Sequence, residues 1–251
     1  MKATIFDIKR CSQNDGQGIR TTIFFKGCNL NCFWCHNPEG KSAKKEHAIF
    51  KNKCIACGIC KKEPKKSFSE SVKYCPSGAR KIYGQEVSVE ELMDIILRDK
   101  DFYLATNGGV TFSGGECMLQ IDFIVELAKC CKEHGVSVAV DTAGNVPYSN
   151  FIKILPYADT FLYDVKCIDS KLHIKGTGQD NTLILENLGK LLKTGKNVVI
   201  RVPVIPNFND KEELDSIKEY CVQRALKVEY LPYHEYGLDK EQALNNGERE
   251  L

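Results

Sequence analysis

Short apolar runs alternate with longer amphipathic segments along most of the chain. The runs have the length and composition of buried strands, and they occupy residues 21–25, 110–112, 136–140, 161–165, 198–202 and 228–231. Helical periodicity marks residues 88–96, 119–134, 148–155, 183–193 and 211–223. Ser88 stands at the N-cap of the first helical segment, with Glu91 at its capping-box position. Weak alternation over residues 4–8 indicates an edge strand.

Repeated strand–helix units predict a parallel sheet that is covered by helices. The six apolar runs are too few for a closed eight-stranded barrel. The predicted fold class is therefore α/β, with a partial (β/α)6 TIM-like barrel that stays open. In such folds the functional groups gather at the carboxyl ends of the strands.

The hydrophobic pattern is interrupted between residues 41 and 85, where lysine and cysteine replace the regular apolar positions. So few apolar residues cannot form a core unaided, so we predict an insert that bound metal holds together. Residues 1–40 and 86–251 then form the barrel, and residues 41–85 form the inserted domain.

Composition and charge narrow the classes of function. The 251 residues carry a formal net charge of +2, whereas an extended nucleic-acid interface usually needs a clearly basic face. No apolar stretch approaches the ~20 residues that span a bilayer. The first residues also lack a signal-peptide pattern. We therefore expect a cytoplasmic protein that binds neither nucleic acid nor membrane.

Thirteen cysteines are many for a cytoplasmic protein, where disulfides are rare and clustered cysteines indicate metal. Seven of them fall into two spaced groups, one after the first apolar run and one in the insert. The other six are interpreted as small buried hydrophobic residues, and they are Cys11, Cys117, Cys130, Cys131, Cys167 and Cys221.

The first group, Cys28-x3-Cys32-x2-Cys35, follows the apolar run at 21–25. Three thiolates with no fourth beside them leave one corner of a [4Fe–4S] cluster open, and an open iron can bind a substrate or cofactor. Two plainer interpretations remain. One is a zinc knuckle that His36 or a distant cysteine completes, and the other is a set of unrelated buried thiols.

The second group consists of Cys54, Cys57, Cys60 and Cys75, the last of which precedes Pro76. This is half of the bacterial ferredoxin pattern, and Pro64 stands where a full motif would place another cysteine. The four cysteines suffice for one cluster, so we predict a ferredoxin-like insert with one auxiliary [4Fe–4S] cluster. The alternative is a zinc ribbon with four cysteine ligands.

Nine lysines lie between Lys41 and Lys66. They form either a solvated face or a docking surface for an acidic electron donor such as a flavodoxin. Docking of this kind predicts that reduction of the protein by flavodoxin slows as the salt concentration rises.

Polar motifs stand at the ends of five of the apolar runs. Each has an ordinary structural explanation, such as a glycine turn, a helix cap, a surface ion pair or a loop residue. All of them meeting at one edge of a barrel instead favours a binding site, in which paired glycines admit a ligand close to the backbone. The motifs are Ser113-Gly114-Gly115-Glu116, Asp141-Thr142-Ala143-Gly144, Asp164-Val165-Lys166, Arg201-Val202-Pro203-Val204 and Pro232-Tyr233-His234.

The first cysteine spacing resembles that of the radical S-adenosylmethionine (SAM) superfamily. Three flanking motifs narrow the resemblance to glycyl-radical-enzyme activating enzymes of the pyruvate formate-lyase activase type: Asp15–Arg20, Gly27–Leu30 and Trp34–Glu39. The resemblance extends to about Ala243. It implies an enzyme that cleaves SAM reductively at a [4Fe–4S] cluster and removes a hydrogen atom from a backbone glycine of a partner enzyme.

The resemblance also implies roles for individual residues. Cys28, Cys32 and Cys35 would hold the catalytic cluster, with its open iron bound to SAM. The other implied SAM contacts are Trp34, Cys35 and His36 at the adenine, Gly114, Gly115 and Glu116 at the methionine amino group, Asp164, Val165 and Lys166, Arg201, and His234. Lys166 and Arg201 offer charge-assisted hydrogen bonds to carboxylate or ribose oxygens.

Asp141, Thr142 and Asp164 resemble residues that hold a monovalent cation beside the SAM carboxylate. Cys117 departs from the family pattern, which has proline at this position. It is either a tolerated small residue or a residue that reaches the cluster or SAM. After His234 no further element is predicted before Leu251, although members of the family usually continue through another helix.

The implied partners are a glycyl radical enzyme, which offers a glycine loop as substrate, and flavodoxin or ferredoxin as electron donor. We expect the chain to be a monomer. Three other functions remain as alternatives: a radical SAM enzyme that acts on a small molecule, a ferredoxin-like electron-transfer protein, and a zinc-binding structural module.

Overall fold

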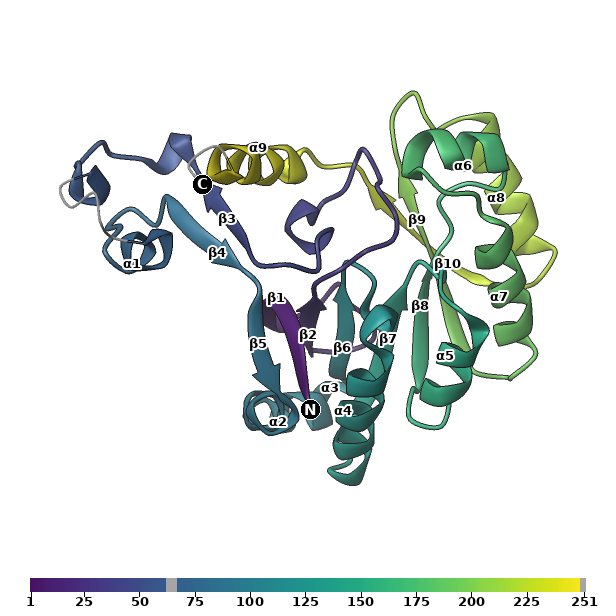
Figure 1. Ribbon diagram of the computed structural model, residues 1–251. Coiled ribbons are helices and arrows are strands. Elements are labelled where there is room, and N and C mark those ends of the chain that lie inside the picture. The colour runs from purple at the N-terminus through teal and green to yellow at the C-terminus, as the bar shows by residue number, and fades with distance from the viewer. Residues whose placement is uncertain (62–66, 249–251) are drawn as a thin grey trace.

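A computed structural model describes residues 1–61 and 67–248 of the protein (Figure 1). One eight-stranded sheet organises it, in the strand order β10-β9-β8-β7-β6-β2-β1-β5. Its strands are β1 (Lys2–Ser12), β2 (Arg20–Phe25), β5 (Gln85–Ser88), β6 (Gly109–Gly114), β7 (Ser137–Thr142), β8 (Thr160–Asp164), β9 (Asn197–Val204) and β10 (Lys227–Pro232).

Six neighbouring strands, from β2 and β6 through to β10, pair in parallel, as the apolar runs predict. The prediction of an α/β fold with a mostly parallel sheet is therefore confirmed. Strands β1 and β5 extend the sheet by antiparallel pairing. The expectation of an edge strand near residues 4–8 is wrong, because β5 pairs with the outer side of β1. The sheet ends at β10 and β5 and is open.

Helices cover the outer face of the sheet (Figure 1). The capping box at the start of the first one is present, with Glu91 N donating to Ser88 Oγ over 3.2 Å. The segment predicted as one helix over 119–134 begins instead with a 3-10 turn, η4 (Cys117–Gln120). The helices are α2 (Val89–Leu97), α3 (Lys100–Thr106), α4 (Ile121–Glu133), α5 (Tyr148–Ile154), α6 (Ser170–Thr177), α7 (Thr182–Leu192) and α8 (Glu212–Val222).

Alternation along the strands separates the core from the site. Ile23, Phe112 and Val140 are fully buried in the apolar core between sheet and helices. The residues next to them in sequence, such as Thr111 and Asp141, must point to the opposite face, because successive strand side chains alternate. The inner face of the sheet is therefore polar, and burial against the helices stabilises the fold.

The region between residues 41 and 85 contains a second, two-stranded sheet, in which β3 (Glu46–Ile49) pairs antiparallel with β4 (Arg80–Tyr83). Figure 1 shows it projecting from the barrel together with α1 (Phe68–Lys73). The short 3-10 turns η2 (Lys51–Lys53) and η3 (Ile59–Lys61) carry the chain between them. Pro64, where a further cysteine was considered, lies outside the described residues.

A helix that sequence analysis did not predict, α9 (Tyr236–Glu248), follows β10. It lies along β3 in Figure 1, and its residues Ala243 and Leu244 share a small apolar cluster with Ala48, Phe50 and Tyr83. The projecting sheet therefore buries its apolar face against the C-terminal part of the chain. Within the described residues, no helix has both the length and the apolar character that crossing a membrane requires.

Candidate functional site

A cavity of about 280 Å³ opens where the parallel strands end. It brings together most of the residues that sequence analysis selected, from separate strand ends and from the loop after β2. Those lining it are Cys28, Cys32, Trp34, Cys35, His36, Gly114, Gly115, Asp141, Thr142, Asp164, Lys166 and Arg201. The rule that function lies at the carboxyl ends of the strands therefore locates this site.

The cluster loop, which we define as residues 26–41, is closed by main-chain hydrogen bonds. Gly27 N donates to Gly40 O over 2.8 Å, and Cys28 N donates to Lys41 O over 2.9 Å. Gly115 lies against both ends of this closure, since an added side-chain carbon there would stand 2.3 Å from Gly27 O and 2.4 Å from Gly40 O. The absence of a side chain at Gly115 therefore allows the cluster loop to pack closely against the turn after β6.

The other side of the cluster loop rests on the end of α6. Asn31 N donates to Thr177 O over 2.7 Å, and Phe33 N donates to Gly176 O over 3.1 Å. Trp34 is buried beside them, with its ring centroid 4.9 Å from that of Phe208. The tip of the loop, which carries the thiols, is therefore fixed from two sides.

The three thiols lie in a setting that disfavours free thiolates. Burial raises the pKa of Cys28 to about 12, and it raises the pKa of Cys32 and of Cys35. The positive charge of Lys166 opposes the rise at Cys32 and Cys35. A bound iron–sulfur cluster would supply the positive charge that three thiolates need at this depth.

The described residues include no group of three or more His, Cys, Asp and Glu side chains arranged to hold a single metal ion. A tetrahedral zinc site needs that convergence. A cubane cluster instead takes its thiolates on separate irons, so its ligands surround a volume and do not meet at a point. The donor chemistry of the three thiols is that of a [4Fe–4S] cluster.

The opposite wall of the cavity is charged. Lys166 Nζ donates to Asp164 Oδ2 over 2.5 Å, and Arg201 Nη1 lies 3.5 Å from Asp141 Oδ2. Burial lowers the pKa of Lys166, but the adjacent carboxylate of Asp164 outweighs this effect and raises it. Burial raises the pKa of Asp141 to about 6, against the attraction of Arg201. The two cations remain charged, and each faces an acidic neighbour.

Arg201 has capacity that its neighbours do not use. Its side chain is buried, and among the described residues its Nε makes no hydrogen bond, although Glu229 Oε2 lies at an ion-pair distance of 3.5 Å. A buried guanidinium donor without an acceptor is costly, and a carboxylate or ribose oxygen of a ligand would satisfy it. The wall therefore suits a ligand that brings oxygen acceptors.

Glu116 lies beneath the cavity and does not line it. Its carboxylate accepts from Thr142 Oγ1 at 2.8 and 2.9 Å, from Ala143 N at 2.9 Å and from Met118 N at 3.2 Å. It thereby ties the turn after β6 to the turn after β7. Because it is wholly buried, its pKa is raised to about 7.

Three other residues of interest also lie away from the cavity. Val165 belongs to the apolar core between its neighbours Asp164 and Lys166. His234 is exposed, with its backbone N 3.4 Å from His36 Nε2. Cys117 is buried in the core, where its Sγ lies 3.5 Å from Phe112 O and from Asp141 O.

Sequence analysis assigned no individual role to several residues of the cavity, among them Asp15, Asn37, Lys41 and Ser113. Ser113 Oγ donates to Asp141 Oδ2 over 2.7 Å, and Asp15 Oδ2 accepts from Thr22 Oγ1 over 2.8 Å. Asp15 and Asn37 belong to motifs that carried the family resemblance, so their position in those motifs was a usable signal. No comparable signal marked Lys41.

The thiols of the insert are far more open to solvent than those of the cavity. Cys54, Cys57 and Cys60 are exposed, and Cys75 is half-buried. Hydrogen bonds from backbone groups and from Ser77 outweigh the effect of burial and lower the pKa of Cys75. These residues stand in the projecting part of the molecule and outside the apolar core.

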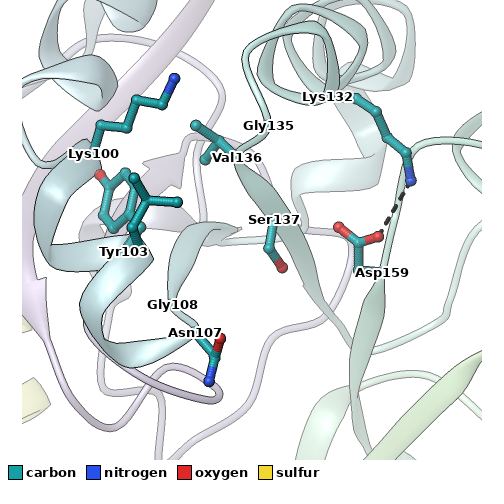
Figure 2. A pocket seen from close by; sticks show the side chains of 10 residues that line it. Lys100, Tyr103, Asn107, Gly108, Lys132, Gly135, Val136, Ser137 and Asp159 are labelled. Atoms are coloured by element: carbon teal, nitrogen blue, oxygen red, sulfur yellow. Dashed lines mark hydrogen bonds and ion pairs between the residues drawn. The ribbon is translucent and has the colours of Figure 1, made fainter.

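A larger cavity, of about 510 Å³, lies at the other end of the barrel (Figure 2). Its lining comes from the segments that precede β6, β7 and β8 and from α3 and α4, and it includes Lys132, whose Nζ lies 3.3 Å from Asp159 Oδ1. It contains no thiol, and the strands begin there. A larger volume than that of the cavity at the strand ends therefore does not by itself mark a functional site.

Comparison with known proteins is consistent with this geometry. A model of the radical SAM superfamily matches residues 22–220. The chain is 40% identical to the trans-4-hydroxy-L-proline dehydratase activating enzyme of Clostridioides difficile, over 96% of this chain and 87% of that one. It is 35% identical to the pyruvate formate-lyase 2-activating enzyme of Escherichia coli, over 95% of this chain and 80% of that one.

Among solved structures, Streptococcus suis SuiB bound to the precursor peptide SuiA is similar in fold, with a TM-score of 0.56. The match covers 86% of this chain and 39% of that chain, at 17% sequence identity. Identity at this level supports the architecture alone.

The buried carboxyl of Glu116 predicts a pH dependence. Its pKa is raised from 4.5 to about 7 on folding, so the folded chain holds a proton that the unfolded chain releases. This contribution to stability is present below the unfolded value and is lost as the pH rises from 4.5 to about 7. Glu116→Gln should flatten that decline, as measured by urea unfolding of the cluster-free chain.

The matched control is Asp122→Asn, which alters an exposed carboxylate paired with Lys153. It should leave the pH dependence of the unfolding free energy as it is in the wild-type chain. An unchanged slope in the Glu116→Gln chain would contradict the assignment.

Proposed function

Because the chain belongs to the radical SAM superfamily, within the group of glycyl radical enzyme activating enzymes, we propose that it activates a partner glycyl radical enzyme. The observation that carries the proposal is the cavity, which is lined both by three thiols and by two pairs of opposite charges. Eight relatives named as activating enzymes align over 82–98% of this chain, which disfavours a small-molecule substrate.

Cys28, Cys32 and Cys35 would hold the [4Fe–4S] cluster. When bound, the cluster supplies the electron that cleaves SAM to methionine and a 5′-deoxyadenosyl radical, which takes a hydrogen atom from the partner's glycine. The protein contributes placement and exclusion of water. Cys32 and Lys166 are buried, and Cys28 and Cys35 are partly buried, which supports the exclusion of water.

We propose that the charged wall orients SAM. Lys166 and Arg201 would donate to its carboxylate or ribose oxygens, and the buried Arg201 Nε has the unused capacity for it. The backbone at Gly114 and Gly115 would receive the methionine amino group, while Trp34, Cys35 and His36 would lie at the adenine. Asp164 would act by holding Lys166 in position.

Glu116, Val165 and His234 would act indirectly. The carboxylate of Glu116 fixes the turns that carry Gly115 and Thr142, and Val165 anchors the pair Asp164 and Lys166 in the core. His234 would steady the ring of His36 from outside the cavity. These are positioning roles, because none of the three side chains lines the cavity.

A monovalent cation beside the SAM carboxylate is a further proposal. Asp141, Thr142 and Asp164 all line the cavity, and two carboxylates there would favour a cation. The affinity for SAM should then be higher in potassium than in tetramethylammonium buffer. Asp141→Asn should abolish that difference, whereas equal affinities in both buffers for the wild-type chain would argue against a bound cation.

We propose that residues 41–85 form a ferredoxin-like insert with one auxiliary [4Fe–4S] cluster on Cys54, Cys57, Cys60 and Cys75. The exposure of these thiols leaves them accessible to an incoming donor. Flavodoxin or ferredoxin as that donor, a monomeric chain and a cytoplasmic location all stay predictions from the sequence.

The activity itself is directly testable. The anaerobically reconstituted chain, given dithionite and SAM, should yield 5′-deoxyadenosine, and it should generate a glycyl radical on a cognate partner, detected by electron paramagnetic resonance. Cys35→Ala should abolish both signals. Cys130→Ala, which removes a thiol on α4 outside both groups, should retain wild-type rates. A wild-type chain that forms no 5′-deoxyadenosine would refute the proposal.

If the insert relays electrons from the donor to the first cluster, a separate prediction follows. Cys54→Ala combined with Cys57→Ala should lose activation when flavodoxin is the donor, yet retain 5′-deoxyadenosine formation with dithionite, which reaches the first cluster directly. Reduction of the wild-type chain by flavodoxin should also slow with added salt, because the docking charges are screened within about 10 Å at 0.1 M. Equal losses with both reductants would instead indicate a purely stabilising insert.

A further inference from the structure

Lys240, on the helix α9, contacts the cluster loop through its ammonium group. Its Nζ lies 2.7 Å from Glu39 Oε1, and it donates to His36 O over 3.0 Å and to Asn37 Oδ1 over 3.1 Å. An ammonium group has three protons, so these three acceptors use all of them. The acceptors belong to the segment 36–39, which directly follows Cys35.

Glu39 makes this contact more than a surface ion pair. Its side chain is only 4% exposed, and its Oε2 makes no hydrogen bond among the described residues. The nearby Lys26 Nζ bonds instead to the backbone carbonyl of Glu39, over 2.6 Å, and pairs with Glu46. Lys240 is therefore the cation that the structure pairs with the Glu39 carboxylate, and a buried carboxylate without its partner is strongly destabilising.

The contact of Lys240 is linked to the thiol of Cys35 through Asn37. A backbone hydrogen bond from Asn37 lowers the pKa of Cys35, against the larger effect of burial. Lys240 holds the side chain of that same Asn37. Gly237, one turn earlier on α9, lies against the Cys35 carbonyl, where an added side-chain carbon would stand 2.0 Å from the oxygen. The start of α9 thus fixes the backbone on both sides of His36.

The far end of α9 is anchored independently. Ala243 and Leu244 pack in the apolar cluster of the projecting sheet, and Asn246 Nδ2 donates to Ile49 O over 3.2 Å. The helix consequently cannot follow the cluster loop if that loop moves. A rigid element that carries a three-way hydrogen-bond donor is suited to hold a ligand-bearing loop in one conformation.

We propose that Lys240 is a positioning residue for the thiol of Cys35 and the ring of His36. Its ammonium fixes segment 35–40, so that both side chains face the cavity before any cofactor binds. The expected effect on SAM binding rests on the function proposed above. The ordering of segment 35–40 by Lys240 does not, so it can be tested without cluster or SAM.

The test compares Lys240→Met with Lys153→Met in the full chain. Lys153 pairs with Asp122 at the same 2.7 Å distance, but both partners are at least half exposed and lie away from the cavity. In the cluster-free chain, Lys240→Met should speed hydrogen–deuterium exchange in segment 35–40 by about tenfold, as expected for the loss of charge-assisted hydrogen bonds. Lys153→Met should leave it unchanged.

In the reconstituted chain, Lys240→Met should raise the KM for SAM in 5′-deoxyadenosine formation by about tenfold, with a smaller effect on kcat. Lys240→Met leaves the buried Glu39 carboxylate unpaired, so it should lower the unfolding midpoint. The double variant Lys240→Met with Glu39→Gln removes that charge, so its midpoint should return towards the wild-type value. Its KM should stay high, because the contacts to His36 and Asn37 are still missing.

Two results would overturn the proposal: unchanged exchange in segment 35–40 of Lys240→Met, or a KM that recovers together with stability in the double variant. The second result would mean that Lys240 only stabilises the fold and does not position the loop. A wild-type chain that makes no 5′-deoxyadenosine would refute the proposed function, while the exchange measurement would still decide whether Lys240 orders the loop.

Discussion

The structure depends on main-chain hydrogen bonds that close the cluster loop on itself and hold it against the end of α6. Gly27 and Cys28 bond to Gly40 and Lys41, while Asn31 and Phe33 bond to the end of α6. Gly115 lets the turn after β6 pack on this closure without a side chain in the way. Because the holding groups are backbone atoms, the thiol, imidazole and indole side chains of the loop are left free to face the cavity.

The charged wall depends on a second balance, between burial and neutralisation. Lys166 and Arg201 are nearly out of contact with solvent, and each remains charged because a carboxylate stands beside it. A wall built of separate buried charges would be unstable without its ligand. Pairing them within the protein stabilises both charges.

Cysteine spacing indicated Cys28, Cys32 and Cys35, and the family resemblance added Trp34 and His36. Periodicity and strand-end rules could predict the six parallel strands and seven other assigned residues of the cavity, because strand alternation and chain direction determine which side chains share an edge. They could not predict side-chain orientation at a strand end, so Glu116 and Val165 were assigned to the ligand although they point beneath it. Helix α9 was not predicted because several of its contacts are made by small residues, namely Gly237, Ala243 and Gly247. Such residues leave little apolar periodicity in the sequence.

The size of the cavity has a consequence for how a macromolecular substrate is used. About 280 Å³ is at the lower end of what a single small-molecule ligand occupies, so a polypeptide cannot be enclosed in it as well. The partner protein then stays outside the cavity and covers it, and only a main-chain segment of the partner enters. Glycine has no side chain, so its Cα hydrogens can approach the cavity unobstructed. Spatial access therefore favours glycine, in addition to its intrinsic reactivity.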